Sequence, residues 1–228
     1  MKVLLTTTSF QDTPGAHHAL LERSGFDVVR ARGPLSEAQM LDLLGQHGGF
    51  DAFLNGDDRI SARVIDAAGP RLRVIAKYGI GLDSIDVAHA TEKRIPVLFT
   101  PGVNHTTVAE HAFGLMIGLA KEFWVHASAV KNGKWVRHTG HELMGKTLGV
   151  LGLGRIGQEV VKRATAFGMR CVAYSPRWPE NFALAHGVMR ATDVGEVLRC
   201  ADVVSLHLPL TSETRNLIDA RALAAMKP

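Results

Sequence analysis

Short apolar segments alternate with helix-patterned segments along the first hundred residues. Each apolar segment has the length of a short buried strand, and together they occupy residues 3–6, 26–29, 52–54, 74–77 and 97–99. Between them, Ser36 and Gln39 match a capping box that begins a helix, and Asp86 matches a helix N-cap. Strands that alternate with helices are typical of a parallel, doubly wound α/β unit. We therefore expect one such unit, with a flavodoxin-like sheet, over residues 1–100.

The same alternation resumes after residue 146. An apolar run at residues 147–151 leads into a glycine-rich turn and then into apolar positions at helical spacing, which are Ile156, Val160, Val161 and Ala164. Further strands are expected at residues 170–174, 187–189 and 203–206, with helices near 182–186 and 194–198 and a last helix capped by Asp219. This order predicts a Rossmann-type unit over residues 101–228 in which only one strand of the second half is present.

The segment between the two units is expected to cross from one to the other at residues 100–104, where Pro101 and Gly102 break the pattern. Thr107 and Glu110 match a capping box, which predicts a helix from there to about Trp124. Apolar residues occur almost all the way round this helix, so we expect it to be buried at a domain or subunit interface, with His111 packed. Residues 126–146 are polar and predict an irregular excursion.

Composition describes an ordinary globular protein of 228 residues, 46% hydrophobic and 21% charged, with a formal net charge of +4. The Lys and Arg residues are scattered, and the absence of a basic run argues against nucleic-acid binding. Cys171 and Cys200 have no close partner, which predicts free thiols in a reducing compartment. The N-terminal apolar stretch is too short for a signal peptide, and no segment has the length of a membrane span. We therefore expect a cytoplasmic protein with no membrane contact.

The glycine-rich turn carries the most specific chemistry in the chain. Gly152, Gly154 and Gly157 form a G-x-G-x-x-G pattern between an apolar strand and a helix. The first glycine permits the tight turn, the second lets backbone N–H groups approach a pyrophosphate, and the third lets the helix pack against the strand. The flanking strand and helix favour a dinucleotide site over a plain glycine-rich turn.

A second glycine-containing loop follows the fourth predicted strand, at residues 77–81. Ligands of parallel α/β sheets lie beyond the carboxyl ends of the strands, and successive backbone N–H groups beside Lys77 suit a carboxylate. A tight turn in which Lys77 is merely solvated fits the same residues equally well. The pattern by itself leaves these two interpretations open.

His138, His141 and Glu142 superficially resemble a metal cluster. Gly140 lies among them and no third partner is evident, so we interpret the segment as a surface loop and expect no metal site.

Taken together, these motifs resemble the D-isomer-specific 2-hydroxyacid dehydrogenase family, and within it the phosphoglycerate dehydrogenase-like members. The resemblance runs over essentially the whole chain, and its carriers are residues 77–86, 100–104, 108–111, Trp135, residues 143–149, the glycine turn, and residues 201–211 with Thr214. It implies an oxidoreductase that transfers hydride between C2 of a D-2-hydroxy acid and NAD(P), most like D-3-phosphoglycerate dehydrogenase. A glyoxylate or hydroxypyruvate reductase, or a nicotinamide-sensing corepressor-like binding protein, is the alternative.

The resemblance also implies roles for individual residues. The substrate carboxylate would lie on a loop made of Lys77, Tyr78, Gly79, Ile80 and Gly81, with Asn104 near the active crevice. The cofactor would be lined by Thr100, Val108, Gly152, Gly154, Arg155, Ile156, Gly157, Leu208, Pro209 and Thr214, and by His207, which resembles a cofactor-side rather than a catalytic histidine. Residues 105–146 would form a homodimer interface.

One departure concerns the cofactor. NAD-binding members of the family carry an acidic residue at the end of the second strand, where it accepts hydrogen bonds from the adenosine ribose. This chain has Ser175, Pro176 and Arg177 there. Without a carboxylate no charge repels a 2′-phosphate, and Arg177 can pair with one. We therefore expect Ser175 and Arg177 to contact the cofactor and NADP to be preferred over NAD.

The other departure concerns catalysis. The family is expected to use a His whose pKa is raised by a Glu, and an Arg that clamps the substrate, and all three positions fall after Pro228. The strand at 203–206 would also leave an unpaired apolar edge. We therefore expect the 228-residue chain to be a fragment with negligible turnover, whose parent protein is the enzyme.

Overall fold

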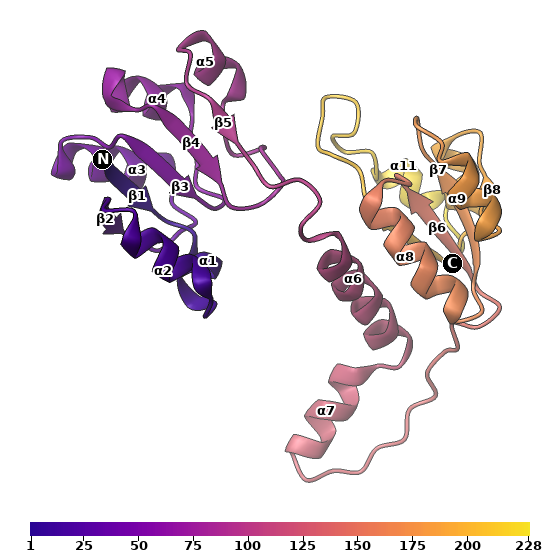
Figure 1. Cartoon of the computed structure of the whole chain (residues 1–228). Coiled ribbons are helices and arrows are strands. Elements are labelled where there is room, and N and C mark those ends of the chain that lie inside the picture. The colour runs from indigo at the N-terminus through magenta and orange to yellow at the C-terminus, as the bar shows by residue number, and fades with distance from the viewer. The chain divides into compact units, whose positions relative to one another are not determined.

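The computed structural model describes all residues, 1–228. The chain divides into two compact units, Met1–Val103 and Asn104–Pro228, which we describe separately (Figure 1). The sequence places the crossing between the units at residues 100–104, and the structural division falls within that segment. No helix is both long enough and apolar enough to pass through a bilayer.

Unit 1 is built on a five-stranded parallel sheet in the order β2-β1-β3-β4-β5. The strands are β1 (Lys2–Leu5), β2 (Asp27–Arg30), β3 (Ala52–Asn55), β4 (Val74–Lys77) and β5 (Val97–Leu98). This is the flavodoxin-like order, as expected from the sequence. Each strand lies within about one residue of its predicted position, because short apolar runs bounded by polar residues define buried strands well.

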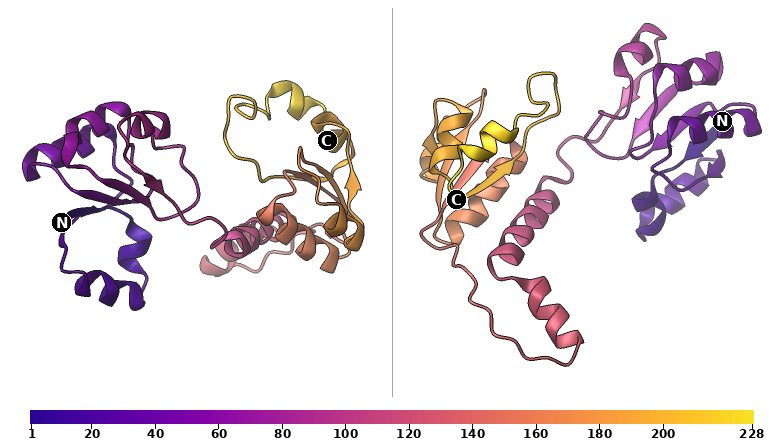
Figure 2. Two further views of the ribbon diagram at one scale, coloured as in Figure 1. Left: turned by 45° about the horizontal axis from the view of Figure 1, so that its top comes forward. Right: turned by 180° about the vertical axis from the view of Figure 1, so that it is seen from behind.

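The helices of unit 1 cover both faces of this sheet (Figure 2). They are α1 (Thr8–Asp12), α2 (Ala16–Arg23), α3 (Glu37–His47), α4 (Ala62–Ala68) and α5 (Val87–Glu92), with a 3₁₀ turn, η1, at Gly69–Arg71. The predicted capping box is present at Ser36, and the Asp86 carboxylate accepts from the His89 N–H. The core of this unit is formed by fully buried side chains such as Leu4, Met40, Phe50, Phe53 and Ile75.

The segment that follows the crossing forms two helices, α6 (His105–Ala120) and α7 (Phe123–Lys131), which differ from the predicted single helix. The predicted capping box is wrong, because α6 begins after Asn104 and Thr107 is already inside it. The chain turns at Glu122, whose φ of 52° lies in the left-handed region. The prediction of an irregular excursion from residue 126 is therefore wrong as far as Lys131.

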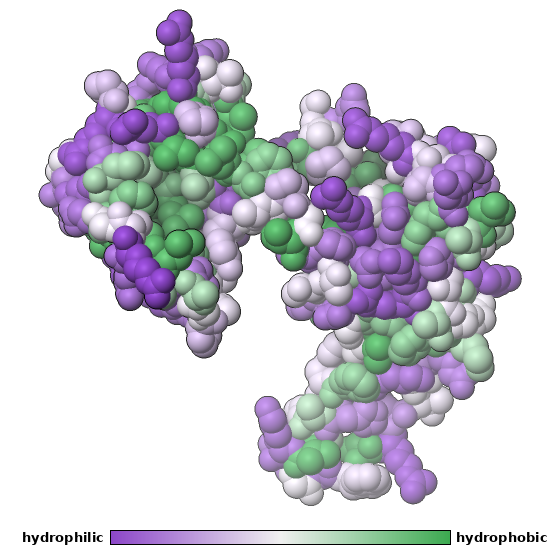
Figure 3. Space-filling model, viewed as in Figure 1, coloured by the Kyte–Doolittle hydropathy of each residue, from purple (hydrophilic) through white to green (hydrophobic).

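Only one face of α6 is buried within the chain. Ala109, Phe113 and Met116 pack with residues of α8 (Arg155–Ala166), whereas Leu115 and Leu119 are 52% and 65% exposed. His111 is exposed, so it is not packed within the single chain, and its packing at a subunit interface stays a prediction. The apolar surface continues along α7, where Figure 3 shows hydrophobic side chains at the surface.

Unit 2 contains a four-stranded parallel sheet in the order β8-β7-β6-β9. The strands are β6 (Thr147–Leu151), β7 (Arg170–Tyr174), β8 (Met189–Arg190) and β9 (Val203–Leu206), and the remaining helices are α9 (Glu180–Ala185), α10 (Val194–Cys200) and α11 (Ala220–Ala224). One buried cluster packs α6 and α8 on the sheet, and a second contains Leu151, Val172 and Val197. This order is the first half of a Rossmann sheet with one strand, β9, beyond its central strand.

Both cysteines are free, in agreement with the sequence. Cys171 lies in β7, and its burial raises the pKa of the thiol to about 11. The thiol is therefore protonated and unreactive near neutral pH. Cys200 is half-buried at the end of α10.

Candidate functional site

The glycine turn of unit 2 brings three backbone segments closer together than side chains would allow. Gly152 has a φ of 98°, and a Cβ built there would lie 2.5 Å from the His207 carbonyl oxygen. A Cβ on Gly157 would overlap the carbonyl oxygen of Gly152. Both glycines are therefore required by the approach of β6, α8 and the end of β9 to one another.

Gly154 is different, because it faces open space. A Cβ built on this residue meets no atom within 4 Å, and its φ of −79° and ψ of −164° are accessible to any residue. Nothing in the packing of the chain therefore requires a glycine at this position. The unfilled space at the start of a helix fits a ligand that approaches the backbone closely.

The first turn of α8 presents unused hydrogen-bond donors to this space. Gly154 is the N-cap and supplies no side-chain cap, and the N–H groups of Arg155, Ile156 and Gly157 donate no hydrogen bond within the chain. The Gln158 side chain turns back to the Leu153 carbonyl, 3.2 Å away. Free N–H groups and the positive end of the helix dipole attract phosphate. The residues present thus fit the pyrophosphate of a dinucleotide.

The end of β9 forms a second wall of this site. The His207 N–H donates to the Leu151 carbonyl at 2.8 Å, and its ring Nε2 lies 2.8 Å from the Ser205 hydroxyl. Burial lowers the pKa of the His207 imidazole, so the ring is neutral at neutral pH. Leu208 and Pro209 continue from it, and the Thr214 hydroxyl donates to the Pro209 carbonyl at 2.6 Å. This hydrogen bond folds residues 209–214 back on themselves.

The segment directly after β7 carries a cationic group, and it has no acidic residue before Glu180. The Ser175 hydroxyl donates to the Arg177 carbonyl at 2.9 Å, and the exposed Arg177 side chain has no acidic partner. The guanidinium of Arg190, from β8, lies 5.2 Å from the ring centre of Trp178. A cation above an indole ring is held by the ring quadrupole. Two arginines are thus available next to the end of β7.

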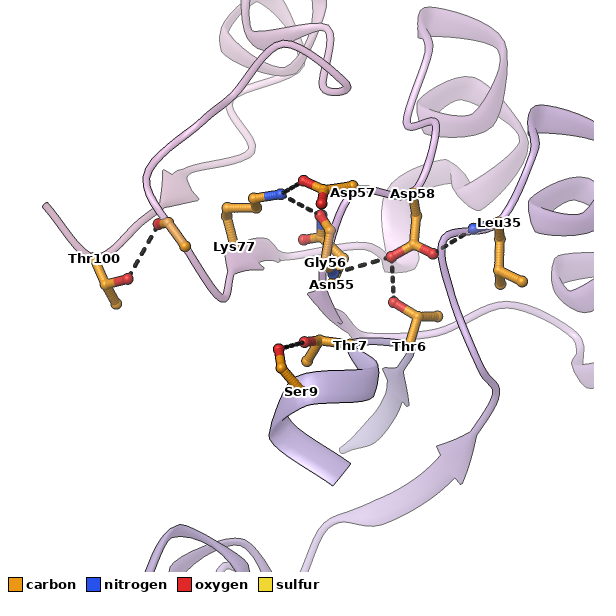
Figure 4. Close-up of polar contacts among 11 residues, drawn as sticks. Thr6, Thr7, Ser9, Leu35, Asn55, Gly56, Asp57, Asp58, Lys77 and Thr100 are labelled. Atoms are coloured by element: carbon orange, nitrogen blue, oxygen red, sulfur yellow. Dashed lines mark hydrogen bonds and ion pairs between the residues drawn. The ribbon is translucent and has the colours of Figure 1, made fainter. Parts of the chain in front are cut away.

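In unit 1, Lys77 is buried and paired, so the interpretation as a solvated lysine is wrong. Its side chain is 3% exposed, and Nζ donates to Asp57 Oδ1 at 2.5 Å and to the Gly56 carbonyl at 2.6 Å (Figure 4). Asp57 is 86% exposed. The Lys77 ammonium therefore joins the end of β4 to the segment that directly follows β3.

The loop at residues 77–81 has backbone donors without partners. The Tyr78 N–H donates to the Asn55 carbonyl at 2.9 Å, whereas the N–H groups of Gly79, Ile80 and Gly81 donate no hydrogen bond within the chain. Gly79 has a φ of 143°, and its carbonyl accepts from the Thr100 N–H and hydroxyl. Successive unpaired N–H groups of this kind form a concave site for an anion.

A buried network holds the neighbouring strand ends in place, and sequence reasoning missed it. The Asp58 carboxylate is fully buried and accepts from the Thr6 hydroxyl at 2.5 Å, the Leu35 N–H at 2.8 Å and the Gly56 N–H at 3.0 Å (Figure 4). Asn55 is also fully buried, and its Oδ1 has no hydrogen-bond partner. The sequence did offer one signal for this network, because a polar residue, Thr6 or Asn55, ends each of two otherwise apolar strand segments.

The remaining predicted residues are divided between the two units. Thr100 lies in unit 1, bonded to Gly79, and Val108 is half-buried in α6 of unit 2. Asn104 is the N-cap of α6, but its side chain makes no capping bond and its Oδ1 is buried without a partner. His138 pairs with Glu122 at 3.0 Å, and no group of three or more potential ligands assembles in the chain.

The chain is similar in sequence to one protein family and to several known enzymes. Residues 113–228 match the family described as "D-isomer specific 2-hydroxyacid dehydrogenase, NAD binding domain". The hydroxypyruvate reductase of Thermotoga maritima is 46% identical over 171 residues, which cover 74% of this chain and 54% of that protein. The D-3-phosphoglycerate dehydrogenase of Methanocaldococcus jannaschii is 44% identical over 171 residues, 74% of this chain and 32% of that protein.

A solved structure agrees over the whole chain. The TT0316 protein of Thermus thermophilus is similar with a TM-score of 0.83 and 36% identity, covering 100% of this chain and 71% of that one. The chain spans only about half the length of the hydroxypyruvate reductase that it matches. Family model, relatives and fold agree with the resemblance seen in the motifs, and the chain belongs to the D-isomer-specific 2-hydroxyacid dehydrogenase family.

Proposed function

We propose that the protein is an NAD(P)-dependent oxidoreductase of D-2-hydroxy acids and the corresponding 2-oxo acids. The observation that carries this proposal is the start of α8, where the N–H groups of residues 155–157 are free beside the open face of Gly154. When bound, the nicotinamide cofactor supplies the hydride that is exchanged with C2 of the substrate. Unit 2 binds the pyrophosphate at this helix end, with His207, Leu208 and Pro209 beside it.

Unit 1 contributes the substrate carboxylate site in this proposal. The N–H groups of Gly79, Ile80 and Gly81 are the donors, and Lys77 fixes the loop from beneath through Gly56 and Asp57. A carboxylate held by backbone donors has a fixed orientation, which hydride transfer to C2 requires. The assignment of residues 1–100 to the substrate and of 101–228 to the dinucleotide belongs to the same proposal.

D-3-phosphoglycerate dehydrogenase and hydroxypyruvate or glyoxylate reductase are the two candidate activities. A relative named D-3-phosphoglycerate dehydrogenase is 44% identical to this chain, and one named hydroxypyruvate reductase is 46% identical. The charge of Lys77 is already neutralised by Asp57, which favours a small acid without a phosphate. A corepressor-like protein that binds the cofactor without turnover is the remaining alternative.

Steady-state assays of the full-length protein test this proposal. NADPH and NADH oxidation is followed separately with hydroxypyruvate, glyoxylate and 3-phosphohydroxypyruvate. We expect turnover of at least one of these 2-oxo acids, because the chain has unpaired N–H donors for the cofactor pyrophosphate at residues 155–157 and for the substrate carboxylate at residues 79–81. Cofactor binding with no turnover of any of the three would support the corepressor-like alternative and contradict the enzymatic proposal.

The cofactor preference is a second part of the proposal, and Arg177 is the residue on which it depends. We expect Arg177→Ala to weaken NADPH binding by about tenfold or more, because a charge-assisted contact to the 2′-phosphate is lost, and to leave NADH binding unchanged. Arg170→Ala is the matched control, since Arg170 lies at the opposite end of β7 and donates to the Gly145 carbonyl. Fluorescence titration measures both affinities. Equal loss of NADPH and NADH affinity would argue against a 2′-phosphate contact.

We also propose that residues 105–146 form a homodimer interface in the cytoplasm. Large apolar side chains are exposed along this segment in the single chain, among them Leu115 (52%), Leu119 (65%), Phe123 (54%), Val130 (64%) and Trp135 (84%). Many large apolar side chains exposed along one segment are typical of a surface that another chain covers.

Analytical ultracentrifugation tests the interface. Leu119→Glu places a charge on this surface, and we expect it to shift the protein from dimer to monomer. Leu184→Glu on α9 is the control, because Leu184 is 84% exposed outside this segment. A wild-type protein that stays monomeric at all concentrations is the result that would reject the dimer.

A further inference from the structure

Unit 1 has a pocket at the edge of its sheet that is opposite the Lys77 loop. It has a volume of about 730 Å³ and is lined by residues that precede β4 and β5 and by the end of α4. Arg73 directly precedes β4, and Ile95 lies two residues before β5. The amino ends of parallel strands meet at this edge, whereas the proposed substrate and cofactor sites use carboxyl ends.

The rim of the pocket is cationic. It carries Arg73, Lys93 and Arg94 against one carboxylate, Asp66. Asp66 is already bonded to Lys93 Nζ at 2.7 Å and to His89 Nε2 at 2.9 Å, and these contacts hold the pKa of its carboxyl group below the usual value. Neither Arg73 nor Arg94 has an acidic partner within the chain. Two guanidinium groups thus remain free at the mouth of the pocket.

The floor of the pocket is apolar. Ile65, Leu72 and Ile95 line it and are themselves 1%, 3% and 8% exposed, so they belong to the core of the unit. The volume lies within the range of small-molecule sites, which is roughly 300–1,000 Å³. An apolar floor with charged groups at its rim suits a ligand whose carbon body is buried and whose anionic groups face outward.

Arg94 occupies a backbone position that usually belongs to glycine. Its φ is 59°, and the Ile95 N–H donates to the Ala90 carbonyl at 2.8 Å, as at a helix end closed by a left-handed residue. An arginine in this conformation is less stable than a glycine would be. Replacing Arg94 by glycine should therefore remove the charge without loss of folding stability.

From the free guanidinium groups, the apolar floor and the volume, we propose that this pocket binds a small organic anion with two or more carboxylate or phosphate groups. Guanidinium groups bind both kinds of oxyanion in a bidentate manner, so the two share one recognition chemistry. The site is separate from the glycine turn and from the Lys77 loop, and it does not depend on the proposed enzymatic function.

Isothermal titration of the full chain with citrate and, separately, with inorganic pyrophosphate tests the proposal. We expect saturable binding of at least one probe with a dissociation constant below about 1 mM. We expect Arg73→Ala and Arg94→Gly each to weaken that binding by about tenfold or more. Arg23→Ala, at the exposed end of α2, is the matched control and should bind as the wild type does.

The Arg94→Gly variant separates binding from folding, because its thermal unfolding midpoint should be equal to or above that of the wild type. Binding of citrate alone identifies a polycarboxylate ligand, and binding of pyrophosphate alone identifies a phosphorylated one. The proposal is overturned if neither probe binds, or if both variants bind as tightly as the wild type. The second result would place the ligand at another anion site of the chain.

Discussion

The close approach of backbone to backbone at the glycine turn is the constraint on which unit 2 depends. The chain leaves β6 through Gly152, passes against the carbonyl of His207, and returns through Gly157 over the carbonyl of Gly152. No side chain fits at either glycine, so strand, helix and the neighbouring strand end are held in a single arrangement. The N–H groups at the start of α8 stay unused because the N-cap residue is Gly154, which has no side chain to cap them.

In unit 1, buried side chains rather than close backbone contacts hold the strand ends in a fixed arrangement. The Asp58 carboxylate ties together the ends of β1 and β3 and the segment that carries Leu35, and Lys77 ties the end of β4 to Gly56 and Asp57. Buried charged groups are tolerated only when they are paired and hydrogen-bonded, and here the pairing fixes loop geometry. In both units the free backbone N–H groups lie beyond the carboxyl ends of parallel strands, which is where such sheets bind ligands.

Much of this fold could be predicted from the pattern of apolar residues, since each strand overlaps a short apolar run of the sequence. The junction of α6 and α7 could not be predicted. The chain turns there at Glu122, which adopts a left-handed conformation although no glycine or proline marks the position. The exposure of His111 was missed because apolar residues surround α6 on all sides while only one face is covered within the chain. The Asp58 network was missed because its partners are 52 and 23 residues away in the sequence. Local pattern cannot reveal a contact of that kind.

The central claim is that the start of α8 holds a dinucleotide pyrophosphate, and NADPH titration of Gly154→Ala tests it most directly. The added methyl group meets no protein atom, so folding should be unchanged, whereas Gly157→Ala should lower the thermal unfolding midpoint. Our account predicts that Gly154→Ala weakens NADPH and NADH binding by about tenfold or more at an unaltered unfolding midpoint. Undiminished affinity for both cofactors in a folded Gly154→Ala protein would contradict it.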